Sequence, residues 1–265
     1  MITSTSQSRC LAVFFALLTL ISFVWAKDAT PAHYVVPSEI DFTKILPSIA
    51  AVTDPQAKVE KDFELSVVIE TQKEASAADV QRARDEARTP DHMPSPFSFS
   101  DVIGPWFKAD NANISLTVAL LKNALDDAEG VIRPAKKNWN RTRPFRQDPA
   151  DIKLQTDDPG EVPGPTSASY PSGHATDGMV FALVLSDLAP ELKDKLIARG
   201  VQYGNDRVIL GVHFPSDVAA GRVLAQAIYT ALKDKKSYQN DLAAAKVQFQ
   251  KELLVHAGQS GAVSK

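Results

Sequence analysis

Apolar residues recur with helical spacing along most of the chain after residue 50, whereas few segments show the strict alternation that is typical of strands. The stretch 218–232 is apolar on nearly every side, which favours a helix buried at the centre of a bundle. We therefore expect an all-α fold, a single-domain helical bundle formed by residues 27–265. The pattern predicts helices over residues 52–72, 76–88, 114–129, 174–188, 190–210, 215–233 and 238–256.

Two polar segments interrupt this pattern. Residues 89–101 contain three prolines without any apolar periodicity, so we interpret them as a connector. Residues 148–166 are rich in Pro, Gly and Asp, which predicts a long surface loop. Loops of this length are uncommon in compact domains and are often functional.

The N-terminus carries the signs of a secretory signal peptide. An uninterrupted apolar run covers residues 11–26, preceded by Arg9 and followed at once by Lys27 and Asp28. The alternative is a membrane anchor, but 16 residues fall short of the ~20 that a spanning helix needs. We expect residues 1–26 to be removed and the protein to be periplasmic or secreted. Cys10 would leave with them, so no thiol would remain for a disulfide or a metal.

Composition narrows the classes of function. The formal net charge is −3, and no second apolar segment is long enough to cross a bilayer. This balance argues against a general nucleic-acid binder and against a membrane-surface binder. We therefore expect neither nucleic acid nor stable membrane insertion.

The first of three candidate clusters is AKKNWNRTRPF, which begins at Ala135. Lys136 and Arg143 are seven residues apart, about two helical turns, so we expect them on one face of a helix that Pro144 ends. The alternative is a basic face that only contacts solvent.

The second cluster is SYPSGHATDG, residues 169–178. Ser172 is a good N-cap, and Gly173 lets the backbone approach a ligand closely. The first turn of the following helix would offer free N–H groups to an anion, next to His174. The alternative is an ordinary turn with a surface histidine.

The third cluster is NDRVILGVHFPSDVAAGR, in which Arg207 ends one helix and Pro215 starts the next. His213 and Asp217 are four residues apart across this junction. A carboxylate there can accept the proton of one imidazole nitrogen and make the other a better nucleophile or base. The alternative is a structural His–Asp cap.

Together the clusters supply cations, a helix N-terminus and two histidines, one of them with a carboxylate partner. Phosphoryl transfer needs fixed positive charge around the phosphoryl oxygens, a nucleophile in line and an acid opposite it. A histidine nucleophile needs no metal, and the sequence has no obvious Asp/His metal cluster.

In this order and spacing, the clusters resemble the signature of the type 2 phosphatidic-acid phosphatase and vanadium haloperoxidase superfamily, written K-x6-R-P, P-S-G-H and R-x5-H-x3-D. The strings AKKNWNRTRPF, SYPSGH and RVILGVHFPSDVAAGR are similar to secreted bacterial class A non-specific acid phosphatases. The similarity covers roughly residues 45–254. Those relatives are soluble, all-α and metal-independent, so the resemblance implies neither a cofactor nor a metal.

The resemblance also implies a role for each site residue. His213 would attack phosphorus and become a phosphohistidine, with Asp217 orienting it. His174 would protonate the leaving alkoxide and then activate water. The groups implied to bind the phosphoryl oxygens, or vanadate in their place, are Lys136, Arg143, Ser172, Gly173 and Arg207.

The implied activity is that of an acid phosphatase that hydrolyses small phosphate monoesters such as nucleotides, sugar phosphates and aryl phosphates. Its natural substrate, transfer of the phosphoryl group to other alcohols and assembly into a homo-oligomer all stay open.

The chain departs from the family pattern at three positions. Asp206 stands where the family usually has serine, and a carboxylate there would weaken anion binding unless it points away or pairs with a cation such as Arg207. The class A pattern also tends to have glycine and threonine at the positions of Ala168 and Ala175.

Two other functions compete with hydrolysis. A vanadate-dependent haloperoxidase would use the same residues, although such relatives are usually much longer. A phosphate-binding protein without catalysis would fit a loss of function at Asp206, but His174, His213 and Asp217 are intact. Integral-membrane lipid phosphatases of the superfamily would need spanning helices that the sequence lacks.

Overall fold

The computed structural model describes residues 33–49, 55–87, 96–156 and 167–262. Within these ranges every regular element is a helix and no strand occurs, so the all-α prediction is confirmed. The predicted signal peptide lies outside the described residues. The α-helices are α1 (Phe42–Ile45), α2 (Pro55–Glu74), α3 (Ala77–Ala87), α4 (Ser100–Ile103), α5 (Ser115–Trp139), α6 (Pro144–Gln147), α7 (Gly173–Leu188), α8 (Lys193–Ile209), α9 (Pro215–Lys233) and α10 (Lys236–Ala262).

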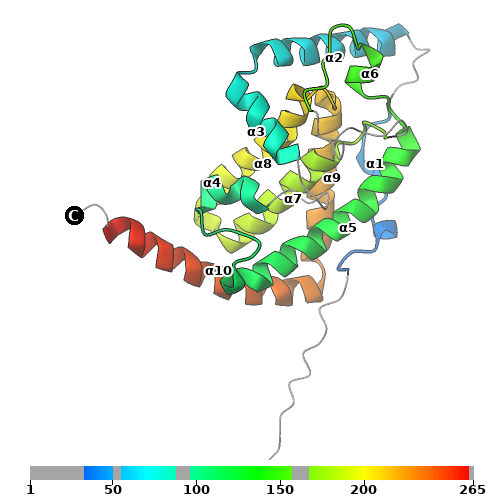
Figure 1. Cartoon of the computed structure of the whole chain (residues 1–265). Coiled ribbons are helices and arrows are strands. Elements are labelled where there is room, and N and C mark those ends of the chain that lie inside the picture. Colours follow the sequence, from blue (N-terminus) through cyan, green and yellow to red (C-terminus); the bar gives the residue numbers. More distant parts are fainter. Residues whose placement is uncertain (1–32, 50–54, 88–95, 157–166, 263–265) are drawn as a thin grey trace, which may run out of the picture.

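Helix α7 lies at the centre of the molecule, packed between α8, α9 and α5 (Figure 1). Thirteen of its sixteen residues are buried. The sequence placed α9 in this position, and that detail is wrong, because α9 turns one side to solvent and leaves Val223 46% exposed. An apolar run of small residues tolerates partial exposure, so it does not by itself identify the central helix.

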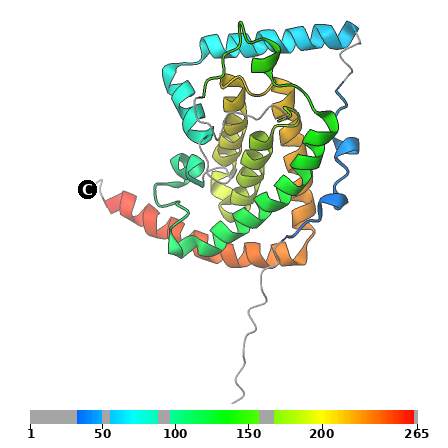
Figure 2. The same ribbon diagram turned by 45° about the vertical axis from the view of Figure 1, so that its right-hand side comes forward.

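Two helices close the ends of this central group. Figures 1 and 2 show α2 lying across one end and α10 across the other, with the long α5 crossing between them. The main apolar core fills the space between α5, α7, α9 and α10, and includes Phe181, Leu185 and Phe249. A smaller core under α2 contains Val68, Phe214 and Val218, and Phe214 directly follows His213.

Helix α5 runs ten residues further than the pattern predicts and ends differently. Val131, Ile132 and Ala135 are buried and carry the helix past Pro134. It ends at Trp139 because Asn140 adopts the left-handed conformation at φ 45°, which asparagine tolerates, and donates its N–H to the Lys136 carbonyl.

The other predicted helices end within three residues of the observed ones, except that α10 begins two residues before the predicted 238–256 and ends six residues after it. The predicted helix 190–210 is divided into a short 3₁₀ turn, Pro190–Leu192, and α8. The first part of the predicted loop, residues 148–156, contains no helix, and residues 157–166 lie outside the described ranges. The connector 89–101 forms a 3₁₀ turn, Pro96–Phe99, and α4 where it is described. No helix among the described residues is both long and apolar enough to cross a membrane.

Candidate active site

The candidate active site is the place where the three sequence clusters meet. Lys136 and Arg143, from the first cluster, belong to two different elements. Lys136 lies in the last turn of α5, and its Nζ donates to the carbonyls of Ala168 at 3.0 Å and Ser169 at 3.5 Å. Arg143 is the N-cap of α6, and Pro144 is that helix's first residue. The prediction of one shared helix face, ended by Pro144, is therefore wrong. The reversal at Asn140 brings the two cations together instead.

Arg143 is buried, and its guanidinium donates both to the loop that carries His213 and to Ser167, which lies before α7. Nη1 donates to the Val212 carbonyl at 2.9 Å and lies 3.2 Å from Nε2 of His213. Nη2 donates to the Ser167 hydroxyl at 2.9 Å. Because an arginine N–H can only donate, Nε2 is the acceptor and the imidazole proton sits on Nδ1.

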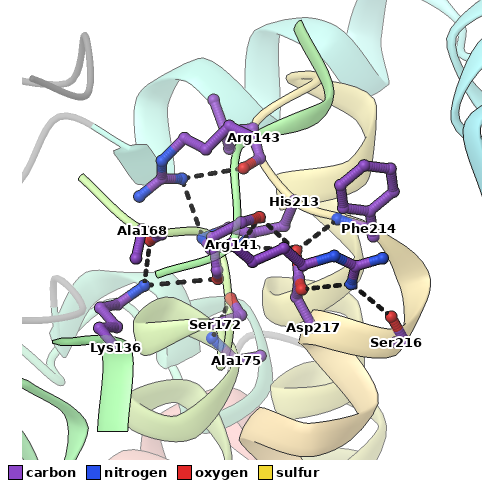
Figure 3. Close-up of polar contacts among 12 residues, drawn as sticks. Lys136, Arg141, Arg143, Ala168, Ser172, Ala175, His213, Phe214, Ser216 and Asp217 are labelled. Atoms are coloured by element: carbon purple, nitrogen blue, oxygen red, sulfur yellow. Dashed lines mark hydrogen bonds and ion pairs between the residues drawn. The ribbon is translucent and has the colours of Figure 1, made fainter. Parts of the chain in front are cut away.

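The N-terminus of α7 lies beside Lys136 (Figure 3), and Ser172 caps this helix as predicted. The Ser172 hydroxyl accepts from the Ala175 N–H at 3.3 Å, and the Ser172 N–H donates to the Asp217 carbonyl at 3.0 Å. Gly173 begins the helix, with the Lys136 side chain 3.8 Å from the position that a Cβ would occupy. Lys136 therefore lies against the N-terminus of α7.

His174 lies in the first turn of α7 with its ring stacked on Tyr203, the centroids 5.8 Å apart. Its Nε2 atom is enclosed and has no hydrogen-bond partner among the described residues. An imidazole nitrogen that is buried without a partner can give a hydrogen bond to a ligand or accept one from it.

His213 and Asp217 meet across the α8–α9 junction as predicted. The turn is possible because Gly211 adopts φ 73°, a conformation that suits glycine. Nδ1 of His213 lies 3.4 Å from Oδ2 of Asp217, and both side chains are buried. The carboxylate thus lies behind the imidazole, and Nε2 points to the cations.

Arg207 completes the cationic set from α8, where it is buried. Its neighbour Asp206 turns away and binds Arg82 of α3 through two hydrogen bonds of 2.9 Å. The structure therefore answers the question that the sequence left open: the partner is Arg82 and not Arg207.

Burial and clustered positive charge lower the pKa of the basic groups in the site. Burial, followed by the charges of Arg207 and His213, holds the pKa of His174 well below its usual value. Burial, followed by Arg143 and Lys136, does the same to the pKa of His213. Burial and then Arg143 lower the pKa of Lys136 to about 7. A site of this kind favours an anion, because negative charge relieves all of these shifts.

Four further residues support Asp217, three directly and one through Arg141, and the sequence did not single them out. The Ser169 hydroxyl donates to Oδ2, which also accepts from the Phe214 N–H at 2.8 Å. Arg141 donates to Oδ1 at 2.7 Å, and Glu64 of α2 binds the same guanidinium. Ser169 lies inside the second cluster and Arg141 inside the first, so proximity to the motifs was a signal. Glu64 lies 77 residues before Arg141, and no pattern connects them.

A cavity of about 990 Å³ lies next to Arg141. Its lining includes Glu64, Arg141 and Ser216, together with Trp139 and Tyr170, but none of the predicted catalytic or phosphate-binding residues. It is therefore distinct from the site of the two histidines.

Within the described residues, no three His, Cys, Asp or Glu side chains gather in a way that could hold a metal.

Known proteins are similar in sequence to the part of the chain that forms this site. The PAP2 superfamily matches residues 113–240, which include every predicted site residue. A non-specific acid phosphatase of Salmonella typhimurium (strain LT2) is 31% identical over 89% of this chain and 90% of its own. The chain belongs to the PAP2 superfamily.

Two further relatives align over a shorter range. An acid phosphatase of Zymomonas mobilis subsp. mobilis is 34% identical over 54% of this chain and 53% of its own. A non-specific acid phosphatase of Providencia stuartii is 39% identical over 50% of this chain and 52% of its own. The chain thus spans about half the length of these two relatives.

Proposed function

We propose that this PAP2 protein is a phosphomonoesterase that works through a phosphohistidine at His213. One observation carries the proposal: Nε2 of His213 faces Arg143 at 3.2 Å while Asp217 lies behind Nδ1. An unprotonated nitrogen directed at clustered positive charge is suited to attack a phosphoryl group held there. The names of the Salmonella, Zymomonas and Providencia relatives support the same class of reaction.

In the first step the Nε2 lone pair of His213 forms a bond to phosphorus, and the ester P–O bond breaks. The leaving oxygen takes the proton of His174, which lies at the helix N-terminus beside the phosphoryl group. Lys136, Arg143 and Arg207 hold the phosphoryl oxygens, together with Ser172 and the Gly173 N–H. Binding of the dianion raises the pKa of His174 from its lowered value, so the acid is charged only when it is needed.

In the second step water attacks phosphorus and His174 accepts the proton of that water. The P–N bond breaks, phosphate leaves, and His213 regains its lone pair. Asp217 stabilises the charge that appears on the imidazole while it carries phosphorus. No metal enters this scheme, so metal independence is part of the proposal.

Hydrolysis of p-nitrophenyl phosphate in the presence of EDTA tests the reaction. We expect the wild type to stay active and His213→Ala to lose on the order of 10³-fold in kcat. His256→Ala is the matched control, because this histidine stacks on Trp106 at the C-terminal helix. Mass measurement after an alkaline quench should find one phosphoryl group on the wild type and none on His213→Ala. A wild type that hydrolyses no phosphate ester but oxidises bromide with vanadate and peroxide would overturn the proposal.

We also propose that the protein acts in the periplasm or outside the cell. The apolar run over residues 11–26 and the charged residues that follow support this location. Fractionation of expressing cells and N-terminal sequencing test it. We expect the exported chain to begin near Lys27, and a full-length chain in the cytoplasm would contradict the proposal.

A further inference from the structure

The carboxylate behind His213 is held from its far side by a second ion pair. Arg141 Nη1 donates to Oδ1 of Asp217 and to the Ser216 hydroxyl, both at 2.7 Å. The guanidinium also lies over the Phe214 ring, 3.9 Å from its centroid. Figure 3 shows these contacts on the side of Asp217 opposite Lys136.

Glu64 fixes this arginine from another helix. One of its oxygens binds Arg141 Nη2, and the other accepts from the Ser216 N–H at 2.9 Å. Glu64 therefore joins α2 to both the arginine and the first turn of α9, where Asp217 lies. The side chains of Arg141 and Glu64 are only 12% and 17% exposed, so solvent screens their charges weakly.

We propose that Arg141 and Glu64 are positioning residues of this site: Glu64 holds the Arg141 guanidinium, which keeps Asp217 turned toward His213. The inference rests on the proposed function, and it adds a specific task for helix α2. Neither residue touches the reacting atoms; both act through Asp217.

The two carboxylate oxygens of Asp217 have different partners, and this affects the protonation of His213. Oδ1 is occupied by Arg141, which leaves Oδ2 to accept from Ser169, Phe214 and the imidazole. A fixed cation beside Asp217 offsets part of the negative charge that His213 faces. The imidazole is therefore less readily protonated and stays a nucleophile in acid, where an acid phosphatase must work.

Charged and titratable groups surround the His213–Asp217 pair on all sides, and the effect of Arg141 must be measured against them. These groups are Glu64 of α2, Lys136 of α5, Arg141 and Arg143 after α5, Tyr170 before α7, His174 of α7 and Arg207 of α8. Burial acts against the charge of Arg141, but Asp217 and Glu64 outweigh it and raise its pKa. The guanidinium stays charged throughout any accessible pH range, so it is a constant influence.

Two changes of charge, Arg141→Gln and the isosteric Glu64→Gln, should move the His213 titration in opposite directions. Arg141→Gln removes positive charge, so His213 should protonate at a pH higher by about one unit. Glu64→Gln removes negative charge and keeps the shape, so His213 should protonate at a pH lower by roughly half a unit. The acidic limb of kcat/KM against pH should follow the same two directions, while the inhibition constant of inorganic phosphate changes less than about threefold.

The titration is read by NMR of ¹⁵N-histidine-labelled protein. The chain has five histidines, and the His213 signal is the one lost in His213→Ala. Lys58→Gln is the matched control, since it removes an exposed cation from α2, the helix that carries Glu64. Arg141→Lys keeps the charge and should lie between Arg141→Gln and the wild type.

An unmoved His213 signal in folded Glu64→Gln, or shifts of the same sign in both variants, would overturn the inference. If Arg141→Gln does not fold, Glu64→Gln and Arg141→Lys still decide the question. The NMR readout needs no turnover, so it stands apart from the proposed function. The wild type could hydrolyse no phosphate ester while the two variants still move the His213 titration in opposite directions. That result would refute the proposed hydrolysis but not the positioning role of Arg141 and Glu64.

Discussion

Asp206 occupies a position where a carboxylate next to bound phosphate would repel it. The structure removes this conflict, because both Asp206 oxygens bind Arg82 and the side chain is only 2% exposed. The carboxylate raises the pKa of Arg82, more than burial lowers it, which fixes the ion pair. The residue thus joins α3 to α8 without facing the candidate site.

We therefore expect Asp206→Ser to leave KM for p-nitrophenyl phosphate within about twofold of the wild type, while the free energy of unfolding falls by about 1–3 kcal/mol. The loss arises because, among the described residues, Arg82 then keeps only Asp79 as a carboxylate partner, and the Asp79 side chain is 38% exposed. Steady-state kinetics and urea unfolding measure the two effects. Asp79→Ser, which removes that other partner, is the control and should cost less. A clear drop in KM for Asp206→Ser would show that the carboxylate does reach the phosphate.

At this scale the sequence predicted the residues that belong to ordered motifs. Ser172, His213 and Asp217 lie where their spacing placed them, because each works within four residues of a helix end. Glu64 and Arg82 escaped prediction, since each acts on a residue more than 70 positions away and nothing local marks that contact.

Close packing of helices brings the motifs into one site. Gly221 of α9 lies against the N-terminus of α7, where an added Cβ would come within 2.6 Å of the Ser172 carbonyl and 3.0 Å of the Ala175 Cβ. Backbone atoms cannot yield as a side chain can. The absence of a side chain at Gly221 therefore sets how near His213 lies to the helix end that would bind phosphate.

We predict that Gly221→Ala forces α9 away from α7, lowers the free energy of unfolding by about 1–3 kcal/mol and reduces kcat/KM by at least tenfold. Thermal unfolding and p-nitrophenyl phosphate kinetics test both parts. Gly130→Ala is the control, because its Cβ would meet the Pro37 ring at 2.8 Å, on the N-terminal segment. It should lose stability but keep its kinetics. Equal catalytic losses in the two variants would show that Gly221 has no special place.

The helices themselves were largely predictable, whereas their junctions were not. The end of α5 depends on three buried apolar residues and a left-handed asparagine, and the sequence pattern favoured a stop at Glu129. The mistake carried over to Lys136 and Arg143, which approach each other through a chain reversal. Periodicity reports which face of a helix is apolar, but it does not report where the chain turns or which helix is central.

The positive charge of the site makes the stability of the whole molecule depend on pH. His174 and His213 both have pKa values held well below 6.5 by burial and neighbouring cations. When the pH falls below about 6.5, the unfolded chain takes up protons on these residues and the empty folded protein does not. The unfolded state then binds more protons, so stability falls with decreasing pH.

We predict that this effect lowers the free energy of unfolding by up to about 1.4 kcal/mol per pH unit for each of the two histidines. Inorganic phosphate should reduce the loss, since it binds the folded state and favours protonation there. Urea unfolding at pH 7, 6 and 5, with and without phosphate, measures both effects. The double variant His174→Asn, His213→Asn should show a shallower dependence. An equal slope in that variant would place the acid sensitivity elsewhere.

The contact between Arg143 and Nε2 of His213 has a consequence for selectivity. In the proposed mechanism the attacking nitrogen is engaged by a cation before phosphate binds, so an uncharged acyl or alkyl reagent would meet a masked lone pair. A bound phosphate would draw the guanidinium to its own oxygens and thereby uncover that nitrogen. The anion would then act both as substrate and as the trigger that frees the residue which attacks it.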